Sequence, residues 1–438
     1  MAQRANRREF LQTTAAGIGF FVAAGVQAAE SRSPNEKIAM ASVGCGGKGS
    51  SDSADAGSKG DMVAICDVDE KTLGAAASRF TKAKKFFDFR KMLEEMGKSI
   101  DAVTVSTPDH CHAVAAAMAM KMGKHCFCQK PLTHTIFEAR ELGRIAKEMK
   151  VATQMGNQGT ANNSLREAAA QLRAGAIGTV TEVHVWTNRP IWPQGGDRPK
   201  PEKAPANLHW EEWLGPAPER PYAKGYHPFS WRGWWDFGTG ALGDMACHTV
   251  NMPYMGLDLK DPVSVQAITS GHNRDSYPKW SIITFQFPAV DWRPAIKFVW
   301  YDGGKRPSRD LVGKDLSGSG CLAIGTKGKQ YAPGDYAENK VEYLDGAEAK
   351  KVEFEQSPGH FEEWVRAIKG GPEARSNFPN YAGGLTEVIL LGNLAVWAAP
   401  EKEQEGKKIE WDAKKLVATN APEVADVVKA PYRKGYSL

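Results

Sequence analysis

A glycine-rich turn carries the residue types that hold a dinucleotide. The run Gly44-Cys45-Gly46-Gly47-Lys48-Gly49 fits the pattern G-x-G-x-x-G, directly after an apolar run and ahead of a polar, small-residue stretch. Glycines in this pattern let the backbone approach a pyrophosphate, which the amide groups and positive end of the following helix then hold. Asp67 ends the next apolar run, where a carboxylate accepts hydrogen bonds from the adenosine ribose and repels a 2′-phosphate. The spacing favours NAD over NADP. Lys48 is the one residue here whose positive charge would favour NADP.

A second chemical group is the amine of Lys130. Gln129-Lys130-Pro131 follows the short run His125 to Cys128, which we predict to be a strand. Lys130 would then lie at the carboxyl edge of a parallel sheet, where ligands of open α/β folds bind. From there it can contact both the nicotinamide ribose and a substrate hydroxyl. A surface lysine in a turn is the alternative.

The elements that must position these groups are alternating strands and helices. Strands are predicted at 37–43, 62–66, 100–106 and 125–128, and helices at 70–80 and 113–122. This alternation predicts an α/β fold with an N-terminal Rossmann domain, a doubly wound parallel sheet, over residues 35–155.

After about residue 155 the pattern changes. Strands are predicted at 180–186, 263–268, 281–287 and 295–300 without regular helical crossovers, and helices at 361–368 and 384–399. We therefore expect a C-terminal α/β domain, residues 156–438, with an open and mostly antiparallel sheet. The segment 187–236 is an irregular stretch rich in Pro, Gly and Trp and too long for a plain connector, and such loops often carry function.

From about Lys37 onward the chain resembles the Gfo/Idh/MocA family of oxidoreductases. Besides the glycine turn, the resemblance rests on Ser106-Thr107-Pro108-Asp109-His110-Cys111-His112, on Gly123-Lys124-His125 leading to Lys130-Pro131, and on Gly243-Asp244-Met245-Ala246-Cys247-His248. The resemblance implies a Rossmann domain joined to an open α/β domain that binds substrate and often builds homo-oligomers.

The resemblance also implies the roles of the site residues. Lys130, Asp244 and His248 would line the substrate pocket, and His248 would be the general base for a hydroxyl that loses hydride. Asp244 would be its electrostatic partner or a substrate ligand, one helical turn away on the same face. Lys130 would orient the hydroxyl. The cofactor contacts implied are those of the glycine turn and Asp67, together with Thr107, Pro108, His112, Lys130 and Asn157.

Two residues depart from the family's pattern. Gln129 stands where the family usually has Glu, which removes a charge beside Lys130 and favours a lower lysine pKa. Ala246 stands where Gly is common, a change that we expect a helix to tolerate.

Weaker substrate candidates lie in the irregular segment. Tyr226-His227-Pro228-Phe229-Ser230-Trp231-Arg232 and Val299-Trp300-Tyr301-Asp302-Gly303-Gly304 are similar to stretches of an exported bacterial branch of the family. Some relatives in the wider family are NAD-dependent glycosidases, in which Tyr226 and His227 would be acid/base candidates. Trp231 and Arg232 complete this weaker set. A loop that only packs or meets solvent explains the same residues equally well.

Tryptophans are concentrated in the same segment. They can present ring faces to a sugar or cyclitol, or they can anchor an irregular insertion to the core, which we favour for most of them. The seven are Trp186, Trp192, Trp210, Trp213, Trp231, Trp234 and Trp235.

The first 28 residues resemble a twin-arginine export signal. Arg7-Arg8 is followed by Glu9-Phe10-Leu11, an apolar stretch over 13–24 and small residues at 26–28. The twin-arginine translocase carries folded proteins, so we expect a periplasmic protein exported with its cofactor inside. An uncleaved terminus is the alternative.

Composition fits a globular, water-soluble protein. Of the 438 residues 42% are hydrophobic and 24% charged. Without residues 1–28 the net charge falls from +5 to about +3, which argues against nucleic acid or stable membrane insertion as a partner. We interpret the seven cysteines as reduced packing residues and expect no metal, since nothing resembles a spaced Cys-x-x-Cys pair. They are Cys45, Cys66, Cys111, Cys126, Cys128, Cys247 and Cys321.

The sequence thus favours an exported NAD-dependent oxidoreductase that acts on a hydroxyl of a sugar, glycoside or cyclitol and holds its cofactor tightly. A glycosidase that uses bound NAD for transient oxidation, elimination, hydration and re-reduction is the alternative. A sugar-binding protein without activity is the third hypothesis.

Overall fold

The computed structural model describes residues 37–338 and 341–438, and residues 37–438 form one compact unit. The predicted export signal lies outside the described residues. Among the described helices, none combines the length and apolarity that a bilayer crossing requires.

The N-terminal half of this unit is a six-stranded parallel sheet with the strand order β3-β2-β1-β4-β5-β6. Its central strands are short runs of buried apolar residues, as expected of a sheet covered on both faces. The predicted doubly wound sheet is confirmed. The strands are β1 (Ile38–Val43), β2 (Gly60–Cys66), β3 (Lys84–Phe86), β4 (Ala102–Val105), β5 (His125–Cys128) and β6 (Thr153–Met155).

Helices connect these strands, and local capping explains where several of them begin. Asp69 caps the helix after β2, and Thr135 forms a capping box with Glu138 on the helix after β5. The helix after β4 begins at Asp109, four residues earlier than predicted, because its polar first turn is buried and lacks a visible apolar periodicity. The helices are α2 (Lys48–Lys59), α3 (Glu70–Arg79), α4 (Phe89–Met96), α5 (Asp109–Lys121) and α6 (Ile136–Met149).

The second sheet has nine strands in the order β13-β12-β11-β7-β10-β9-β8-β14-β15. Only β7 and β10 pair in parallel, so the predicted, mostly antiparallel sheet is confirmed. The strands are β7 (Val180–Trp186), β8 (Ser264–Thr269), β9 (Ser281–Phe287), β10 (Ile296–Tyr301), β11 (Gly320–Gly325), β12 (Gly328–Pro333), β13 (Glu342–Leu344), β14 (Ile409–Asp412) and β15 (Val417–Ala418).

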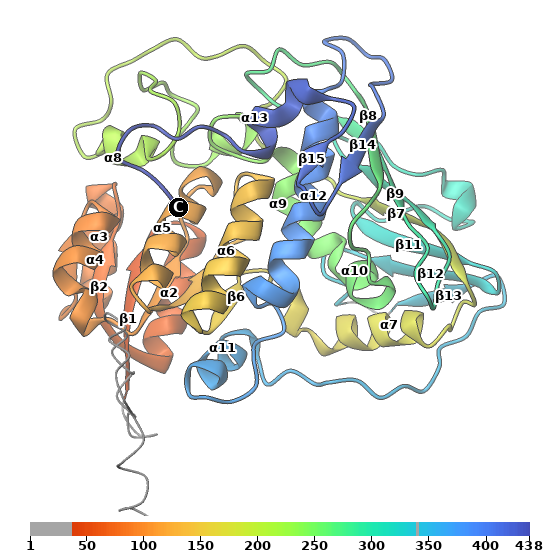
Figure 1. The fold of residues 1–438 in the computed structure, drawn as a ribbon, viewed down its shortest axis with the longest axis horizontal. Helices are drawn as coiled ribbons and strands as arrows, with labels where there is room; N and C mark the ends of the chain where they lie inside the picture. The colour runs from red at the N-terminus through yellow and green to blue at the C-terminus, as the bar shows by residue number, and fades with distance from the viewer. Residues whose placement is uncertain (1–36, 339–340) are drawn as a thin grey trace, which may run out of the picture. The chain divides into compact units, whose positions relative to one another are not determined.

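One helix joins the two halves at the core. α12 (Gly383–Trp397) is apolar around its whole circumference and buried along nearly its entire length. It packs against α6 on one side and against α9 (Gly240–Thr249), β8 and β9 on the other (Figure 1). A helix without a polar face belongs in an interior, and this one forms the interior shared by both sheets. Beside it, α7 (Asn163–Arg173) packs on α10 (Asn251–Leu257).

The irregular segment 187–236 contains one short helix, α8 (Trp210–Leu214), and a single 3₁₀ turn at Ser230–Gly233. Five of its six tryptophans are buried, as is Trp186 at the end of β7, and Trp210 stacks on Trp213 at a ring distance of 4.7 Å. The packing role that we favoured for most of the tryptophans therefore agrees with the structure. Their burial anchors a loop that has little regular hydrogen bonding of its own.

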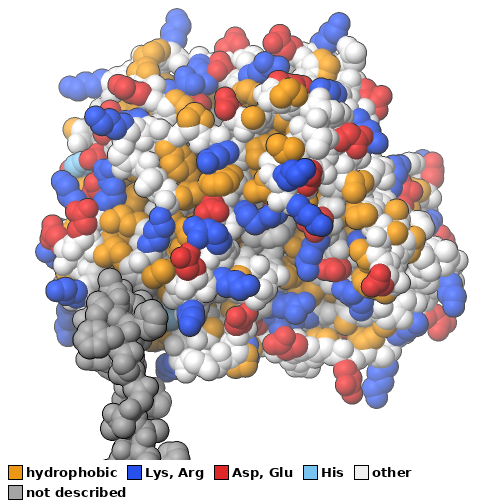
Figure 2. Space-filling model, in the orientation of Figure 1, with side chains coloured by type: hydrophobic (Ala, Val, Ile, Leu, Met, Phe, Trp, Pro, Cys, Tyr) orange, Lys and Arg blue, Asp and Glu red, His pale blue; other side chains and the backbone are white. Residues whose placement is uncertain are grey.

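α11 (His360–Ile368) returns from the C-terminal part of the chain to the first sheet (Figure 1). Phe361 stacks on Phe127 of β5 at 4.5 Å, and the indole of Trp364 donates to the carbonyl of Ala152. The core on this face of the parallel sheet thus contains residues from both ends of the sequence. On the face drawn in Figure 2, basic and acidic side chains are interspersed with apolar ones.

Candidate functional site

The glycine turn between β1 and α2 is shaped by contacts that exclude side chains. Gly44 has φ +81°, and a Cβ there would lie 2.5 Å from the carbonyl oxygen of Ser106. A Cβ on Gly49 would lie 2.2 Å from the carbonyl oxygen of Gly44. α2 has no side-chain cap; the N–H groups of Gly49 and Ser50 in its first turn donate to the carbonyls of Gly46 and Gly47, which leaves the N–H of Lys48 for an anion.

Asp67 lies at the end of β2, as predicted. Its carboxylate accepts a hydrogen bond from the backbone N–H of Cys45 at 2.7 Å and another from that of Asp69. Burial raises its pKa. The amine of Lys48, the residue whose charge would favour NADP, donates to Asp52 on its own helix at 2.8 Å. The charge of Lys48 is therefore engaged away from Asp67.

Asp52 also explains Gln129, the departure from the family's pattern. Asp52 is fully buried, and its second oxygen accepts hydrogen bonds from Ser106 and from the amide nitrogen of Gln129, each at 2.8 Å. A glutamate at position 129 would bring a second carboxylate to this oxygen. The neutral amide is therefore the side chain that Asp52 requires.

Lys130 lies at the carboxyl end of β5, on a cis peptide bond to Pro131. Its amine donates to Asp244 twice, to the backbone carbonyl at 2.7 Å and to the carboxylate at 2.9 Å. The structure thus brings together two of the three residues that the resemblance implied for the substrate pocket, one from the turn after β5 and one from helix α9.

Asp244 is the electrostatic centre of this site. Arg232 donates to the same carboxylate oxygen at 3.2 Å as Lys130 does at 2.9 Å. Burial of Asp244 disfavours its charge, but Lys130 and Arg232 outweigh the burial and lower its pKa to about 2. The site therefore holds two cations around one carboxylate.

His248 follows one turn later on α9 and is buried, with no described residue within hydrogen-bonding reach of its Nδ1. Burial, and then the charge of Lys130, lower its pKa well below the ordinary value. His248 is therefore a neutral imidazole with a free nitrogen, the state in which it can accept a proton.

Tyr336, which no sequence motif indicated, lies against His248. The two rings meet edge to face at 4.7 Å, and Tyr336 lies in the turn after β12. Burial and the carboxylates of Asp335 and Asp244 raise its pKa, so the phenol is neutral. The strand before it was not predicted, and the tyrosine itself stands in no recognisable spacing.

The remaining cofactor candidates show what a ligand would satisfy. Among the described residues, the hydroxyl of Thr107 and the amide nitrogen of Asn157 are buried without hydrogen-bond partners, whereas the Asn157 oxygen accepts from Ser376 at 2.6 Å. Buried polar groups of this kind normally have partners. Together with the glycine cradle, they fit a dinucleotide that runs from Asp67 toward Lys130.

His112 and Pro108 hold the same edge in place. Both ring nitrogens of His112 lie 2.8 Å from backbone carbonyl oxygens, those of Pro131 and Thr107, and Pro108 precedes the first residue of α5. His112 thus ties the turn of Lys130 to the turn of Thr107.

Of the weaker substrate candidates, the structure brings Arg232 to Asp244. Its guanidinium lies over the ring of Trp231 at 4.2 Å and near Phe229 at 4.7 Å. Tyr226 is instead buried in an aromatic cluster with Trp234, and His227 lies 3.8 Å from Asp69, on the side of β2. These two residues are not assembled with Lys130.

The seven cysteines are all buried and unpaired in the described part of the chain. Burial raises the pKa of thiols such as Cys111, to about 12. Within the described ranges no three His, Cys, Asp or Glu side chains are grouped as a metal site would require.

Two family models match the chain. The first, described as an oxidoreductase family with an NAD-binding Rossmann fold, matches residues 38–157. The second, described as the C-terminal alpha/beta domain of the oxidoreductase family, matches residues 174–291. Both are models of Gfo/Idh/MocA proteins, and together they cover more than half of the chain.

Individual relatives are more distant. A levoglucosan dehydrogenase of Pseudarthrobacter phenanthrenivorans is 24% identical over 43% of this chain and 40% of its own length. A 2,7-anhydro-N-acetylneuraminate hydratase of Escherichia coli is 29% identical over 21% of this chain and 26% of its own. The chain thus matches less than half the length of these curated relatives.

Solved structures match far more of the chain. The WlbA dehydrogenase of Bordetella pertussis, crystallised with NADH and UDP-GlcNAcA, superposes with a TM-score of 0.60 at 19% identity, over 86% of this chain and 99% of that one. At this identity the likeness concerns the fold.

Proposed function

Because the chain belongs to the Gfo/Idh/MocA family of NAD-binding oxidoreductases, we propose that it oxidises or reduces a carbon–hydroxyl group of a sugar, glycoside or cyclitol. The observation that carries the proposal is the amine of Lys130, held on Asp244 one helical turn from the unpartnered nitrogen of His248. This arrangement leaves a lysine to hold a hydroxyl oxygen and a neutral imidazole to take its proton.

The residues of the chain divide the work as follows. Lys130 donates a hydrogen bond to the oxygen of the reacting hydroxyl, and Asp244 holds the amine in place through its carboxylate and its backbone carbonyl. His248 accepts the hydroxyl proton at Nε2, because Nδ1 is enclosed by the fold and Nε2 makes no hydrogen bond with a described residue. NAD supplies the hydride acceptor when bound, and Thr107, Asn157 and the glycine turn would hold it. Burial of the site excludes water, which strengthens each of these contacts.

We further propose that the cofactor stays bound between turnovers. The backbone N–H of His209 donates to the carbonyl of Val68, and the N–H of Glu70 donates to the carbonyl of Asn207, each at 2.9 Å. The amide of Asn207 also donates to Asp69 at 2.8 Å. This segment, Asn207 to His209, covers the loop after β2 beside Asp67, the residue expected to hold the adenosine ribose. Retention suits a periplasmic enzyme exported by the twin-arginine route, since soluble NAD is scarce there.

A glycosidase that uses bound NAD is the second candidate, favoured by the similarity to the anhydro-sialic acid hydratase. Such chemistry needs an acid or base on the leaving-group side in addition to His248. The ring of Tyr226 packs against Trp234, and His227 lies beside Asp69, so neither residue is placed for this role. Tyr336 is the phenol that faces His248, and it takes their place in this hypothesis.

The first test concerns the cofactor. The protein is purified without added nucleotide and denatured, and the supernatant is assayed for NAD(H). We expect close to one equivalent per chain. Protein that neither releases nor binds NAD contradicts the proposal.

The second test separates the two activities. Free sugars, cyclitols and aryl glycosides are incubated with the protein while reduced nicotinamide and aglycone are followed. Reduction of the cofactor identifies the oxidoreductase, and aglycone release without net reduction identifies the glycosidase. Lys130→Met and His248→Asn should each lower kcat/KM by about 100-fold or more with NAD still bound. Full activity of either variant would refute the site.

A further inference from the structure

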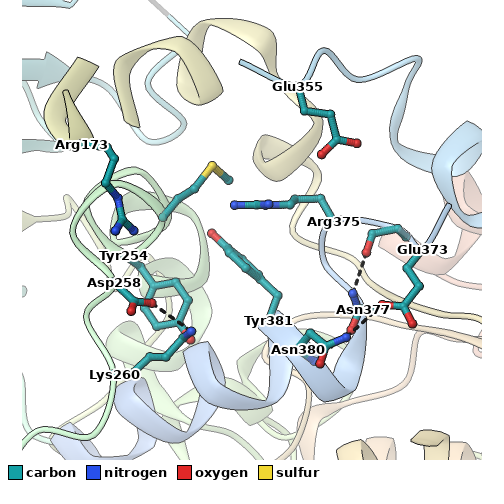
Figure 3. A pocket seen from close by; sticks show the side chains of 12 residues that line it. Arg173, Tyr254, Asp258, Lys260, Glu355, Glu373, Arg375, Asn377, Asn380 and Tyr381 are labelled. Carbon is teal, nitrogen blue, oxygen red and sulfur yellow. Dashed lines mark hydrogen bonds and ion pairs between the residues drawn. The ribbon is translucent and has the colours of Figure 1, made fainter. Parts of the chain in front are cut away.

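A second pocket lies away from Lys130, between α7, α10 and the segment that precedes α12. It has a volume of about 390 Å³, within the range of small-molecule sites. Two arginines define it: Arg173, the last residue of α7, and Arg375. In Figure 3 their guanidinium groups point toward the middle of the pocket from opposite sides, with the ring of Tyr381 between them.

The two guanidinium groups lack anionic partners. Among the described residues neither makes a hydrogen bond or ion pair; Arg173 lies over the ring of Trp292 at 4.0 Å, and Arg375 lies 5.6 Å from the ring of Tyr381. Partial burial lowers the pKa of Arg173; the nearby carboxylate of Asp258 raises it, and the charge of Arg375 lowers it. Both arginines are exposed and line one cavity, and their guanidinium N–H donors are not used by any described residue.

The carboxylates that line the same pocket are paired with groups other than the two guanidinium groups. Asp258 pairs with Lys260 at 2.9 Å, and Glu373 accepts from the amide of Asn380 at 2.9 Å. Glu355 lies 3.9 Å from Arg366. Figure 3 places Glu355 and Glu373 at the periphery. The centre of the pocket is thus left to the arginines.

A further polar group at the pocket is unsatisfied. The hydroxyl of Tyr254 is buried and has no hydrogen-bond partner among the described residues, although the side chain lines the cavity. This hydroxyl is enclosed against α12, where a Cβ on Gly384 would lie 2.8 Å from it, so only the ring of Tyr254 is offered to a ligand.

We propose that this pocket binds a small anion, a carboxylate or phosphate group carried by a sugar-sized molecule, between Arg173 and Arg375. Guanidinium groups match both anions through paired N–H donors. The remaining lining of tyrosine rings and of Asn377 and Asn380 amides suits the apolar and hydroxyl faces of a carbohydrate.

The pocket is joined to the cofactor site by two short connections. Ser376, next to Arg375, donates to Asn157 at 2.6 Å. Tyr381 donates to Asn251, whose amide donates to Thr160 at 2.7 Å. An anion that fixes Arg375 therefore acts on the segment that holds Asn157, while binding itself does not depend on the proposed activity.

The test uses the full chain with its cofactor at constant ionic strength in chloride. Binding of inorganic phosphate, D-glucuronate, D-glucose 6-phosphate and, as the neutral match, D-glucose is measured by calorimetry and by thermal shift. We expect at least one anion to bind and D-glucose not to. Phosphate binding and glucuronate binding distinguish the two anion classes.

Arg173→Gln and Arg375→Gln should each weaken anion binding by about tenfold or more. Arg309→Gln, which alters an exposed arginine elsewhere, should leave it unchanged. If a glutamine variant fails to fold, Arg375→Lys keeps the charge. It should still weaken anion binding, because lysine lacks the paired N–H donors of the guanidinium group. No anion bound above chloride, or binding unaffected when both arginines are replaced, would overturn the proposal.

Discussion

Asp52 and Gln129 show how one buried carboxylate dictates its neighbour. We expect Gln129→Glu to lower the free energy of unfolding by about 2 kcal/mol, since two carboxylates would share one buried position and one of them would have to be protonated. Urea unfolding measures the change.

Asp52→Asn combined with Gln129→Glu restores one donor and one acceptor, and is the matched control. It should recover most of the lost stability. A single Gln129→Glu variant as stable as the wild type would show that Asp52 does not need the amide.

Tyr336 is the residue with the clearest unassigned chemistry at the site. Its hydroxyl makes no hydrogen bond with a described residue, and its ring rests on His248. We expect Tyr336→Phe to raise KM about tenfold, the worth of one hydrogen bond to substrate, with NAD binding unchanged.

Tyr336→Ala, which also removes the ring from His248, should lower kcat as well. Steady-state kinetics on the substrate found in the panel separates these effects. If Tyr336→Phe and the wild type have equal kinetics, the Tyr336 hydroxyl does not bind substrate, and its ring contact with His248 is the role that remains.

Among elements, the segment Asn207 to His209 is the one that we propose as the cover of the cofactor. Asn207→Ala together with His209→Ala removes the hydrogen bond from the Asn207 amide to Asp69 and the stacking of His209 on Phe87 at 4.0 Å. We expect NAD to dissociate about tenfold faster, with the fold retained.

Dissociation is followed by the fluorescence change on displacement of bound NADH. Asn420→Ala, which removes a hydrogen bond between β14 and its neighbour, is the control and should leave the rate unaltered. An unchanged rate in the double variant would assign the segment a packing role alone.

Elements differ in how well the sequence predicts them. The parallel strands are short buried runs bounded by turns, so β1, β2 and β5 were predicted closely. The stretch over β11 and β12 is broken by Gly320, Gly325 and Gly328, and its pairing with β7 is set by contacts distant in sequence.

The residues of the site also differ in how well the sequence predicts them. Lys130, Asp244 and His248 stand in spaced motifs, so the sequence indicated them as candidates, and the structure brings Lys130 to Asp244. Arg232 was located only as a weak candidate, because a loop gives no register from which to derive its approach to Asp244. Tyr336 and the bond between Gln129 and Asp52 depend on tertiary packing that no local pattern encodes.

For the whole molecule, the charge network at Asp244 makes stability depend on pH. The folded pKa of about 2 lies below the ordinary 3.8, so the network stabilises the fold above about pH 4 and is lost as the pH falls toward 2. The contribution of this network to the free energy of unfolding that is lost on acidification is about 2 kcal/mol.

Asp244→Asn should therefore be less stable than the wild type at pH 7, with a difference that narrows between pH 4 and pH 2. Urea unfolding at each pH measures it. Asp291→Asn, in an exposed loop, should run parallel to the wild type. A constant difference for Asp244→Asn across this range would contradict the assignment.

The return of α11 to the first sheet has a consequence for synthesis. The Trp364 indole meets the Ala152 carbonyl across 212 positions of sequence. At ordinary translation speeds the ribosome needs roughly 10 to 40 seconds to cover that interval. Throughout it, the apolar surface of Phe127 that Phe361 and Trp364 will cover stays exposed, although α2 and α3 already pack on the neighbouring part of this face. A route that exports only folded chains would have to wait until α11 has docked.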